Sequence, residues 1–205
     1  VGGKISVNLG LLTSATAVAQ IRTAYVDDTT TTAGFAAGTL TASGVNSVRG
    51  GAYDDSLTGG GRVNTSGSAT TVSGDRSFEA FRGNGGNDIS NGRTGVDRAD
   101  YNTGGQSEGI VVNLAAGTVR GDPLLTGSDT LRGIESITGT YLDDVYSAVG
   151  FTLSNVTAPS RNSGDAIVTA PTGETLASTA YNEFRAIGGN DSVTGNGATR
   201  VSFSN

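Results

Sequence analysis

Five aspartates occupy a fixed place in short glycine-containing segments, and their carboxylates offer the plainest chemistry in this chain. Each is the sixth residue of a nine-residue segment: Asp55, Asp88, Asp97, Asp144 and Asp191. Carboxylate and carbonyl oxygens are the ligands that Ca²⁺ prefers, and it takes roughly six to eight of them. An aspartate in a tight turn can instead accept hydrogen bonds from backbone amides without any metal. The segments therefore indicate either calcium sites or metal-free Asx turns.

Glycine fills the first, second or fourth position in several of these segments. Because glycine has no Cβ, it accepts positive φ and lets other groups approach the backbone closely. A tight turn of this kind can aim its carbonyl oxygens at the point that the aspartate faces. The glycines expected to form metal-binding turns with the aspartates are Gly50, Gly51, Gly83, Gly85, Gly86, Gly188 and Gly189.

The composition excludes most catalytic chemistry. The chain has 0 His and 0 Cys, so it cannot build a Ser-His-Asp triad, a cysteine nucleophile, a His or Cys zinc site or a disulfide. The adjacent carboxylates at 27–28, 54–55 and 143–144 would face opposite sides of a strand, which makes them poor acid–base pairs. The net charge of -6 argues against a nucleic-acid-binding surface. We expect no enzyme.

Short apolar runs and abundant glycine predict an all-β protein with many tight turns. The chain has 33 Gly, and runs such as "KISVNLG" and "GIVVNLAAG" alternate with period two. No run of about 18 apolar residues is present, so we expect no membrane-spanning helix. The opening "VGGKISVNLG" resembles neither a signal peptide nor an initiator start, which predicts a chain processed or cut from a longer one.

Three segments of the first half recur in the same order in the second half. The matched pairs are 4–10 with 109–115, 41–57 with 130–146, and 81–90 with 184–193. Repetition on this scale predicts tandem structural units. We therefore expect two modules, 1–103 and 104–205, that form one continuous structure.

The two ends of the chain match the junction between the modules. Joining "TRVSFSN" at 199–205 to "VGGKISVNL" at 1–9 gives a string similar to "GVDRADYNTGGQSEGIVVNL" at 95–114. The terminal coils of a parallel stack expose strand edges that pair readily with other strands. The match predicts a longer tandem array or head-to-tail association of chains.

The nine-residue segments resemble the G-G-x-G-x-D-x-U-x repeat of RTX, or haemolysin-type, calcium-binding proteins. They read "GGAYDDSLT" at 50–58, "GNGGNDISN" at 83–91, "GTYLDDVYS" at 139–147 and "AIGGNDSVT" at 186–194. The resemblance covers most of both modules, outside the loops at 11–38, 65–77 and 148–180. It implies a right-handed parallel β-roll, or β-solenoid, with Ca²⁺ between neighbouring turns. It also implies that position 8 of each segment points into the core.

Some positions depart from the repeat. Asn64 and Arg200 stand where the nine-residue period next expects an aspartate. Arg200 cannot ligate a cation, so we expect it to pair with a carboxylate instead. Glu135 and Asn46 reach position 6 of their segments without the glycines.

The strand pattern also predicts which apolar side chains are buried. The expected core residues are Leu57, Ile89, Ile137, Val193, Val111 and Leu114, with Val7 and Leu9 repeating the last pair. The aromatic residues expected to fill the interior, in preference to binding sugar, are Tyr53, Phe78, Phe81, Tyr101, Tyr141 and Phe184.

Three classes of function are compatible with these features. The tandem modules favour a calcium-binding structural segment of a secreted, extracellular or cell-surface protein: a fibre, a surface layer or an adhesin stalk. The alternative is the calcium-binding secretion domain of an RTX enzyme or toxin whose catalytic part lies elsewhere, exported by type I secretion. A glycan- or ice-binding module is the third class, but no clustered aromatic or threonine face supports it. The expected partners are calcium ions and further copies of the module, without nucleic acid.

Overall fold

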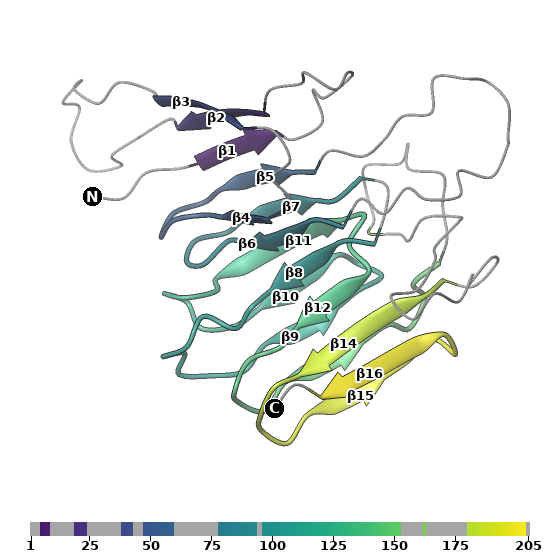
Figure 1. The fold of residues 1–205 in the computed structure, drawn as a ribbon. Helices are drawn as coiled ribbons and strands as arrows, with labels where there is room; N and C mark the ends of the chain where they lie inside the picture. Colours follow the sequence, from purple (N-terminus) through teal and green to yellow (C-terminus); the bar gives the residue numbers. More distant parts are fainter. Residues whose placement is uncertain are drawn as a thin grey trace, which may run out of the picture.

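Two packed sheets make up the part of the chain that can be described. The computed structural model describes residues 47–59, 78–93, 96–152, 162 and 180–203, and the backbone of three strands at 5–8, 19–23 and 38–42. Within these residues the structure is all-β, as predicted (Figure 1). None of the same residues belongs to a helix that is long and apolar enough to span a membrane.

The strands divide between a ten-stranded sheet, here sheet A, and a six-stranded sheet, here sheet B. Sheet A has the order β15-β13-β9-β10-β11-β7-β5-β1-β2-β3, and sheet B has the order β16-β14-β12-β8-β6-β4. The strands of sheet A are β1 (Ile5–Asn8), β2 (Ala19–Thr23), β3 (Gly38–Ala42), β5 (Ser56–Thr58), β7 (Ile89–Asn91), β9 (Val111–Asn113), β10 (Thr118–Arg120), β11 (Ser128–Arg132), β13 (Val145–Ser147) and β15 (Ser192–Thr194). Those of sheet B are β4 (Ser47–Arg49), β6 (Ala80–Arg82), β8 (Arg98–Asp100), β12 (Ser136–Thr138), β14 (Asn182–Ala186) and β16 (Thr199–Phe203).

The chain passes back and forth between the sheets. From β4 to β9 each successive strand belongs to the other sheet, and the same alternation runs from β11 to β16. All pairings in sheet B are parallel. Consecutive strands are therefore joined by turns that connect one sheet to the other, and these turns carry the aspartates.

Sheet A is not parallel throughout, so the prediction of a continuously parallel stack is wrong in two places. β2 is antiparallel to β1 and β3, and β10 is antiparallel to β9 and β11. A tight turn reverses the chain after β9. The amide of Gly117 donates to the carbonyl of Leu114 at 3.1 Å, and Gly117 has φ +68°. Glycine adopts this left-handed conformation at no steric cost, which favours a hairpin here.

The pairing registers repeat between the two halves of the chain. β1 pairs with β5 so that Val7 lies opposite Leu57, and β9 pairs with β13 so that Val112 lies opposite Tyr146. In each half the parallel strand is also bordered by an antiparallel one, β2 or β10. The matched sequence segments thus occupy equivalent places in the sheets. The boundaries at 1–103 and 104–205 stay a prediction.

The prediction that position 8 faces the core is confirmed. The position-8 residues are Val48, Leu57, Ser90, Ala99, Ile137 and Tyr146, all buried, and Val193, which packs against the core. Leu114 is buried as predicted, but Ile89 and Val111 are exposed and those two predictions are wrong. Each stands next to the true inward position, and adjacent strand residues face opposite sides. The predictions for Val7 and Leu9 fall outside the described side chains.

The aromatic predictions are partly confirmed. The predicted interior aromatics that are buried are Phe81, Tyr101 and Phe184. Tyr53 and Tyr141 are exposed, because both lie on turns and not on strands, so their assignment to the interior is wrong. Phe78 is half-buried. Tyr146, which is outside the predicted set, is also buried and stacks on Phe184 with 5.1 Å between ring centroids.

Candidate functional site

Three acidic residues form a column where the chain enters sheet A, two of them directly before strands β5 and β7 and the third near the start of β11. The amide of Asp55 donates to Oδ1 of Asp88 at 2.7 Å, and the amide of Asp88 donates to Oδ1 of Asp129 at 2.8 Å. Asp55 also accepts a hydrogen bond at Oδ2 from the amide of Gly51, at 2.6 Å. Asp88 and Asp129 thus each accept a hydrogen bond from the amide of the column member before them, and Asp55 accepts one from within its own turn. We call Asp55, Asp88 and Asp129 the first acidic column.

The first acidic column lies out of contact with water. Asp55, Asp88 and Asp129 are all buried. Burial, together with the charge of Asp129, raises the pKa of Asp88 to about 8. Burial also raises the pKa of Asp129 to about 7. Oδ2 of Asp88 is fully buried and receives no hydrogen bond from any described residue. The column therefore holds negative charge only at a considerable cost unless a proton or a cation joins it.

A second acidic column runs along the turns that enter sheet B. The amide of Glu79 donates to Oδ1 of Asp97, and the amide of Asp97 donates to Oε2 of Glu135, both at 2.9 Å. All three side chains are buried. Burial raises the pKa of Asp97 to about 11, and the charges of Glu135 and Glu79 add to the effect. Oδ2 of Asp97 is buried and has no hydrogen-bond partner among the described residues. This column has the same construction as the first.

Asp144 and Asp191 form a third pair, and here backbone donors satisfy the inner carboxylate. Oδ1 of Asp144 accepts from the amide of Ile110 at 2.7 Å, and Oδ2 accepts from the amide of Thr140 at 2.8 Å. The hydroxyl of Thr140 donates to Oδ1 of Asp144 as well, at 2.8 Å. The amide of Asp144 in turn donates to Oδ1 of Asp191 at 2.9 Å. Burial raises the pKa of Asp191. The arrangement at Asp144 is that of a metal-free Asx turn.

Where a nine-residue segment begins with glycine, that glycine is required for a direct steric reason. A Cβ added to it would overlap the carboxylate of the position-6 aspartate, which folds back onto the glycine Cα. The glycine–aspartate pairs with this contact are Gly50 with Asp55, Gly83 with Asp88, Gly92 with Asp97, and Gly139 with Asp144. Close approach to the carboxylate thus accounts for the glycine in each turn.

The predicted glycines at the third and fourth positions of the segments shape the turns, and no carboxylate lies near the Cβ that each lacks. Gly86 has φ +107° and Gly189 has φ +84°, which side chains with a Cβ rarely adopt. A Cβ at Gly85 would overlap the carbonyl of Leu124. A Cβ at Gly188 would meet the carbonyl of Tyr141 at 3.1 Å. These glycines are therefore needed for the turn and for its packing.

A calcium ion would need ligands beyond the side chains seen here. Among the residues that the structure describes, no group of three His, Cys, Asp or Glu side chains is placed to hold a metal ion. Asp88 and Asp97 fit a cation best, because each keeps one buried oxygen that receives no hydrogen bond from the part of the chain that the structure describes. Asp144 fits a cation poorly, because hydrogen bonds reach both of its oxygens. Main-chain carbonyls and water would have to complete any coordination shell.

Sequence reasoning missed two members of the acidic columns. Glu79 could have been found, because extending the nine-residue phase backwards from Gly83 to residue 74 places it at position 6. Asp129 carried no such signal. It joins the first column because β11 pairs in parallel with β7 and sets Asp129 beside Asp88, 41 residues away.

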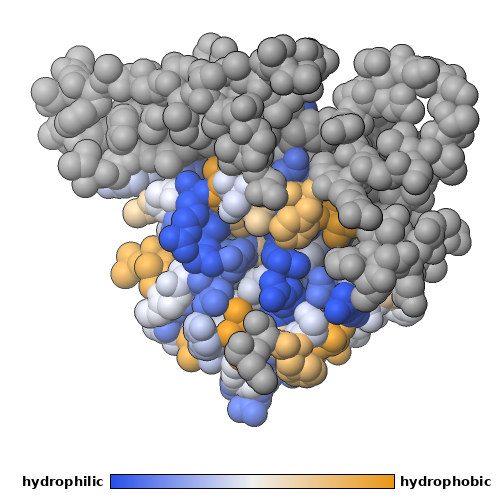
Figure 2. Space-filling view, viewed as in Figure 1, coloured by the Kyte–Doolittle hydropathy of each residue, from blue (hydrophilic) through white to orange (hydrophobic). Residues whose placement is uncertain are grey.

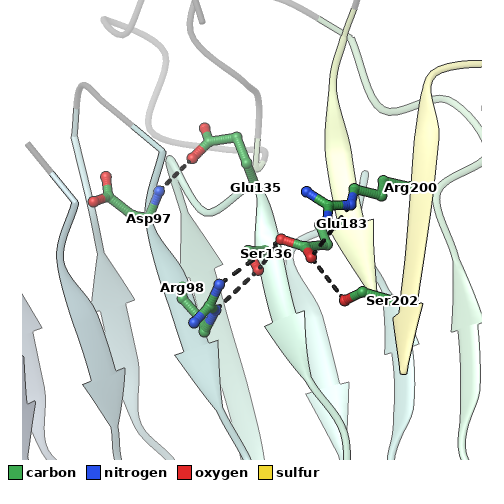
Figure 3. A network of polar contacts seen from close by, with 7 residues as sticks. All are labelled: Asp97, Arg98, Glu135, Ser136, Glu183, Arg200 and Ser202. Atoms are coloured by element: carbon green, nitrogen blue, oxygen red, sulfur yellow. Dashed lines mark hydrogen bonds and ion pairs between the residues drawn. The ribbon is translucent and has the colours of Figure 1, made fainter. Parts of the chain in front are cut away.

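A separate polar network crosses the outer face of sheet B (Figure 3). Arg98 Nε donates to Ser136 Oγ at 3.1 Å, and Ser136 Oγ donates to Glu183 Oε2 at 3.4 Å. Ser202 Oγ donates to Glu183 Oε1 at 2.8 Å, and Arg200 forms an ion pair with the same oxygen at 3.9 Å. The prediction that Arg200 pairs with a carboxylate is confirmed. Figure 2 shows hydrophilic surface in the middle of the described part of one face, with apolar patches around it.

The register corrects the position given to Arg200. β14 pairs with β16 so that Arg200 lies opposite Glu183 and Val201 lies opposite Phe184. In the first half, Arg98 occupies the same place, beside Ala80 on β6. Arg200 is therefore equivalent to position 7 of the repeat, and Thr199 takes position 6. The sequence between Thr194 and Arg200 is one residue shorter than that between Asn91 and Arg98, which shifts the phase by one residue.

Comparisons with known proteins give no relative: no family model matches the chain, and no significant match is found among curated proteins or solved structures.

Proposed function

We propose that this chain is a calcium-binding structural segment of a secreted, extracellular protein, built as a right-handed β-roll of RTX-like modules. The observation that carries the proposal is the pair of buried acidic columns. Asp88 and Asp97 each hold a carboxylate oxygen that is inside the protein and receives no hydrogen bond from the described residues. An oxygen of this kind needs a proton or a cation.

Calcium suits these positions better than a proton does near neutral pH in a calcium-rich medium. The columns supply hard oxygen ligands and several neighbouring negative charges, which is the donor set of calcium sites. Binding would displace the protons that the raised pKa values of Asp88 and Asp97 retain. Calcium would hold neighbouring turns together at the same time, because each column spans several of them.

The alternation of the chain between the sheets supports the roll. Turns enter sheet A on one side and sheet B on the other, and each successive turn stacks on an equivalent one through parallel pairing. The position-8 side chains fill the space between the sheets. A repeating stack of this kind suits a structural spacer.

Circular dichroism with and without calcium tests the proposal. Because calcium binds only the folded columns, it should stabilise the fold by mass action. We expect chelator to reduce the β signal without abolishing it and to lower the midpoint of thermal unfolding, and millimolar calcium to raise both. Spectra and midpoints that do not respond to calcium would refute calcium binding and leave the turns as metal-free Asx turns.

Calorimetry on matched variants tests the site. Asp88→Asn removes the negative charge of the carboxylate that carries the unsatisfied oxygen and should weaken calcium binding by at least tenfold. Asp122→Asn is the control, because Asp122 lies in the loop between β10 and β11, outside the nine-residue segments. Equal losses of affinity in both variants would show that the first acidic column is not the site.

A further inference from the structure

The junction between the two halves of the chain is a strand pairing with a defined register. β8 pairs in parallel with β12, so that Arg98 lies opposite Ser136 and Ala99 lies opposite Ile137. Arg98 Nε donates to Ser136 Oγ at 3.1 Å across this junction. In sheet A the same junction is made by β7 and β11. It buries Ala99 and Tyr101, which are 2% and 6% exposed.

β16 is the equivalent of β8, but it lies at the end of the stack. β8 pairs with β6 with Ala99 opposite Phe81, and β16 pairs with β14 with Val201 opposite Phe184. In Figure 1, β15 and β16 lie at the opposite end of the stack from β3. Val201 is 40% exposed, whereas its equivalent Ala99 is almost fully buried.

The aromatic residue at the end of β16 shows the same contrast. Phe203 follows Val201 by two residues, as Tyr101 follows Ala99, and it is 81% exposed. The residues that the internal junction covers are thus apolar and uncovered at this end. An exposed apolar strand edge is a template for another strand.

The edge that could cover β16 is found at the other end of the same molecule. β4 pairs with β6 as β12 pairs with β14, with Ser47 opposite Ala80 and Ser136 opposite Glu183. β12 is bordered on its other side by β8, whereas β4 has no further partner strand among the described residues. β4 is therefore the equivalent of the strand that receives β8.

We propose that the β15–β16 edge of this unit binds the β3–β4 edge of a second copy, in the register of the internal junction. Arg200 then lies opposite Ser47, repeating the Arg98–Ser136 pair. Val201 lies opposite Val48, repeating the Ala99–Ile137 contact. Directly opposite residues form a row across sheet B that begins with a serine and ends with an arginine in each half: Ser47 to Arg98, and Ser136 to Arg200. The proposed pairing sets the last arginine of one copy beside the first serine of the next.

The second sheet continues in the same way. β7 pairs with β11 so that Ile89 lies opposite Thr130. Transferred to β15 and β3, this register sets Ser192 opposite Thr41. Both sheets of one unit would therefore extend into the next without a change of register, which is a heterologous and non-closing contact.

The contact between copies is less acidic than the internal junction. By the sequence match, Leu40 stands in the place of Asp129 and Asn46 in the place of Glu135, and Thr199 stands in the place of Asp97. The acidic pairs of the internal junction thus recur as neutral or singly charged ones. This inference rests on the proposed structural role of the segment, but not on calcium.

Cysteine cross-linking tests the register, because the natural chain contains no cysteine. Residues directly opposite on paired strands are separated by a Cα–Cα distance of about 5 Å, which a disulfide spans. A chain carrying both Ser47→Cys and Arg200→Cys should form a ladder of dimers, trimers and longer species on a non-reducing gel. Each single variant alone should give no ladder.

A register control distinguishes the proposal from unspecific aggregation. Ser202 stands two residues beyond Arg200, so a Ser47→Cys and Ser202→Cys pair lies about 8 Å apart in the proposed register, beyond the reach of a disulfide. This variant should stay largely monomeric on the gel. Equal ladders in both double variants, or no ladder in either while circular dichroism shows folded protein, would overturn the proposal.

A charge at the edge provides an independent measurement. In the chain without introduced cysteines, Val201→Lys should lower the mass measured by light scattering to that of a single unit, because lysine on an edge strand opposes strand addition. Val111→Lys is the control, since Val111 is exposed on an internal strand of sheet A. The same association in both variants would refute the edge contact. All measurements are made with and without calcium. A chain that does not respond to calcium but still cross-links in register refutes only the calcium proposal. A chain that responds to calcium but forms no ladder refutes only the edge contact.

Discussion

Raising the pH in the absence of calcium should destabilise this protein, because its buried carboxyls keep their protons in the folded state. The pKa of Asp88 lies at about 8 and that of Asp129 at about 7, against an ordinary value of 3.8. Between pH 4 and pH 7 the unfolded chain gives up protons that the folded chain retains. Stability is therefore greatest below about pH 4 for these groups and is lost as the pH rises through the folded pKa values.

The magnitude follows from the size of the shifts. One carboxyl that stays protonated in the folded state and ionises in the unfolded state costs about 1.4 kcal/mol of unfolding free energy per pH unit. Asp88 alone therefore predicts a loss of about 3 kcal/mol between pH 5 and pH 7. Asp97 lowers the free energy of unfolding further over the same range, since burial raises its pKa to about 11.

Urea unfolding followed by circular dichroism in chelator, at pH 5, 6, 7 and 8, measures this dependence. Asp88→Asn should reduce the slope by about 1.4 kcal/mol per pH unit, because asparagine does not titrate. Asp122→Asn is the matched control. Hydrogen bonds from Ser107 and from the amide of Leu124 lower the pKa of Asp122 to about 2, so it stays ionised in both states over this range. A wild-type stability that is flat or rises with pH, or an unchanged slope in Asp88→Asn, would refute the reasoning.

Three further substitutions test the packing of the turns and the core. Gly83→Ala should destabilise the fold by about 1–3 kcal/mol in chemical denaturation, because its Cβ would overlap a buried carboxylate, while Gly188→Ala should cost less. Asn162→Ala should lower the free energy of unfolding by at least about 2 kcal/mol, because the buried side-chain amide of Asn162 bonds both the backbone amide and the carbonyl of Ile134. A loss below about 0.5 kcal/mol would contradict this. Phe184→Ala should lower stability by about 3–5 kcal/mol, whereas the exposed Phe203→Ala should leave a single unit nearly unchanged; comparable losses would show that burial does not set the cost.

Local patterning was enough to predict the strands that contain a nine-residue segment. Their alternation is short and regular, so position 8 points inward even where the residue is as small as Ala99 or as polar as Ser90. Hydrophobicity alone misled at Ile89, because the larger apolar residue of the pair stands on the outer face. Phase within the repeat was therefore a better guide to burial than residue type.

The features that sequence reasoning did not predict depend on contacts distant in the chain. Asp129 joins the first acidic column only because β11 pairs with β7, and no local motif marks it. The antiparallel strands β2 and β10 interrupt the parallel sheet where the nine-residue period is absent. Burial of the carboxyls likewise follows from stacking, because a single turn would leave Asp88 or Asp97 in water.

The unequal size of the two sheets sets the shape of any longer assembly. Each half of the chain contributes five strands to sheet A and three to sheet B, which gives the ten and six strands observed in the described residues. At about 4.8 Å per strand, one half advances by about 24 Å along sheet A but by only about 14 Å along sheet B, and the sheets lie about 10 Å apart. Successive halves would then be inclined to one another by about one radian, with sheet A on the convex side. Combined with the twist of the strands, this inclination would wind a row of units into an arc or a coil, in place of a straight rod.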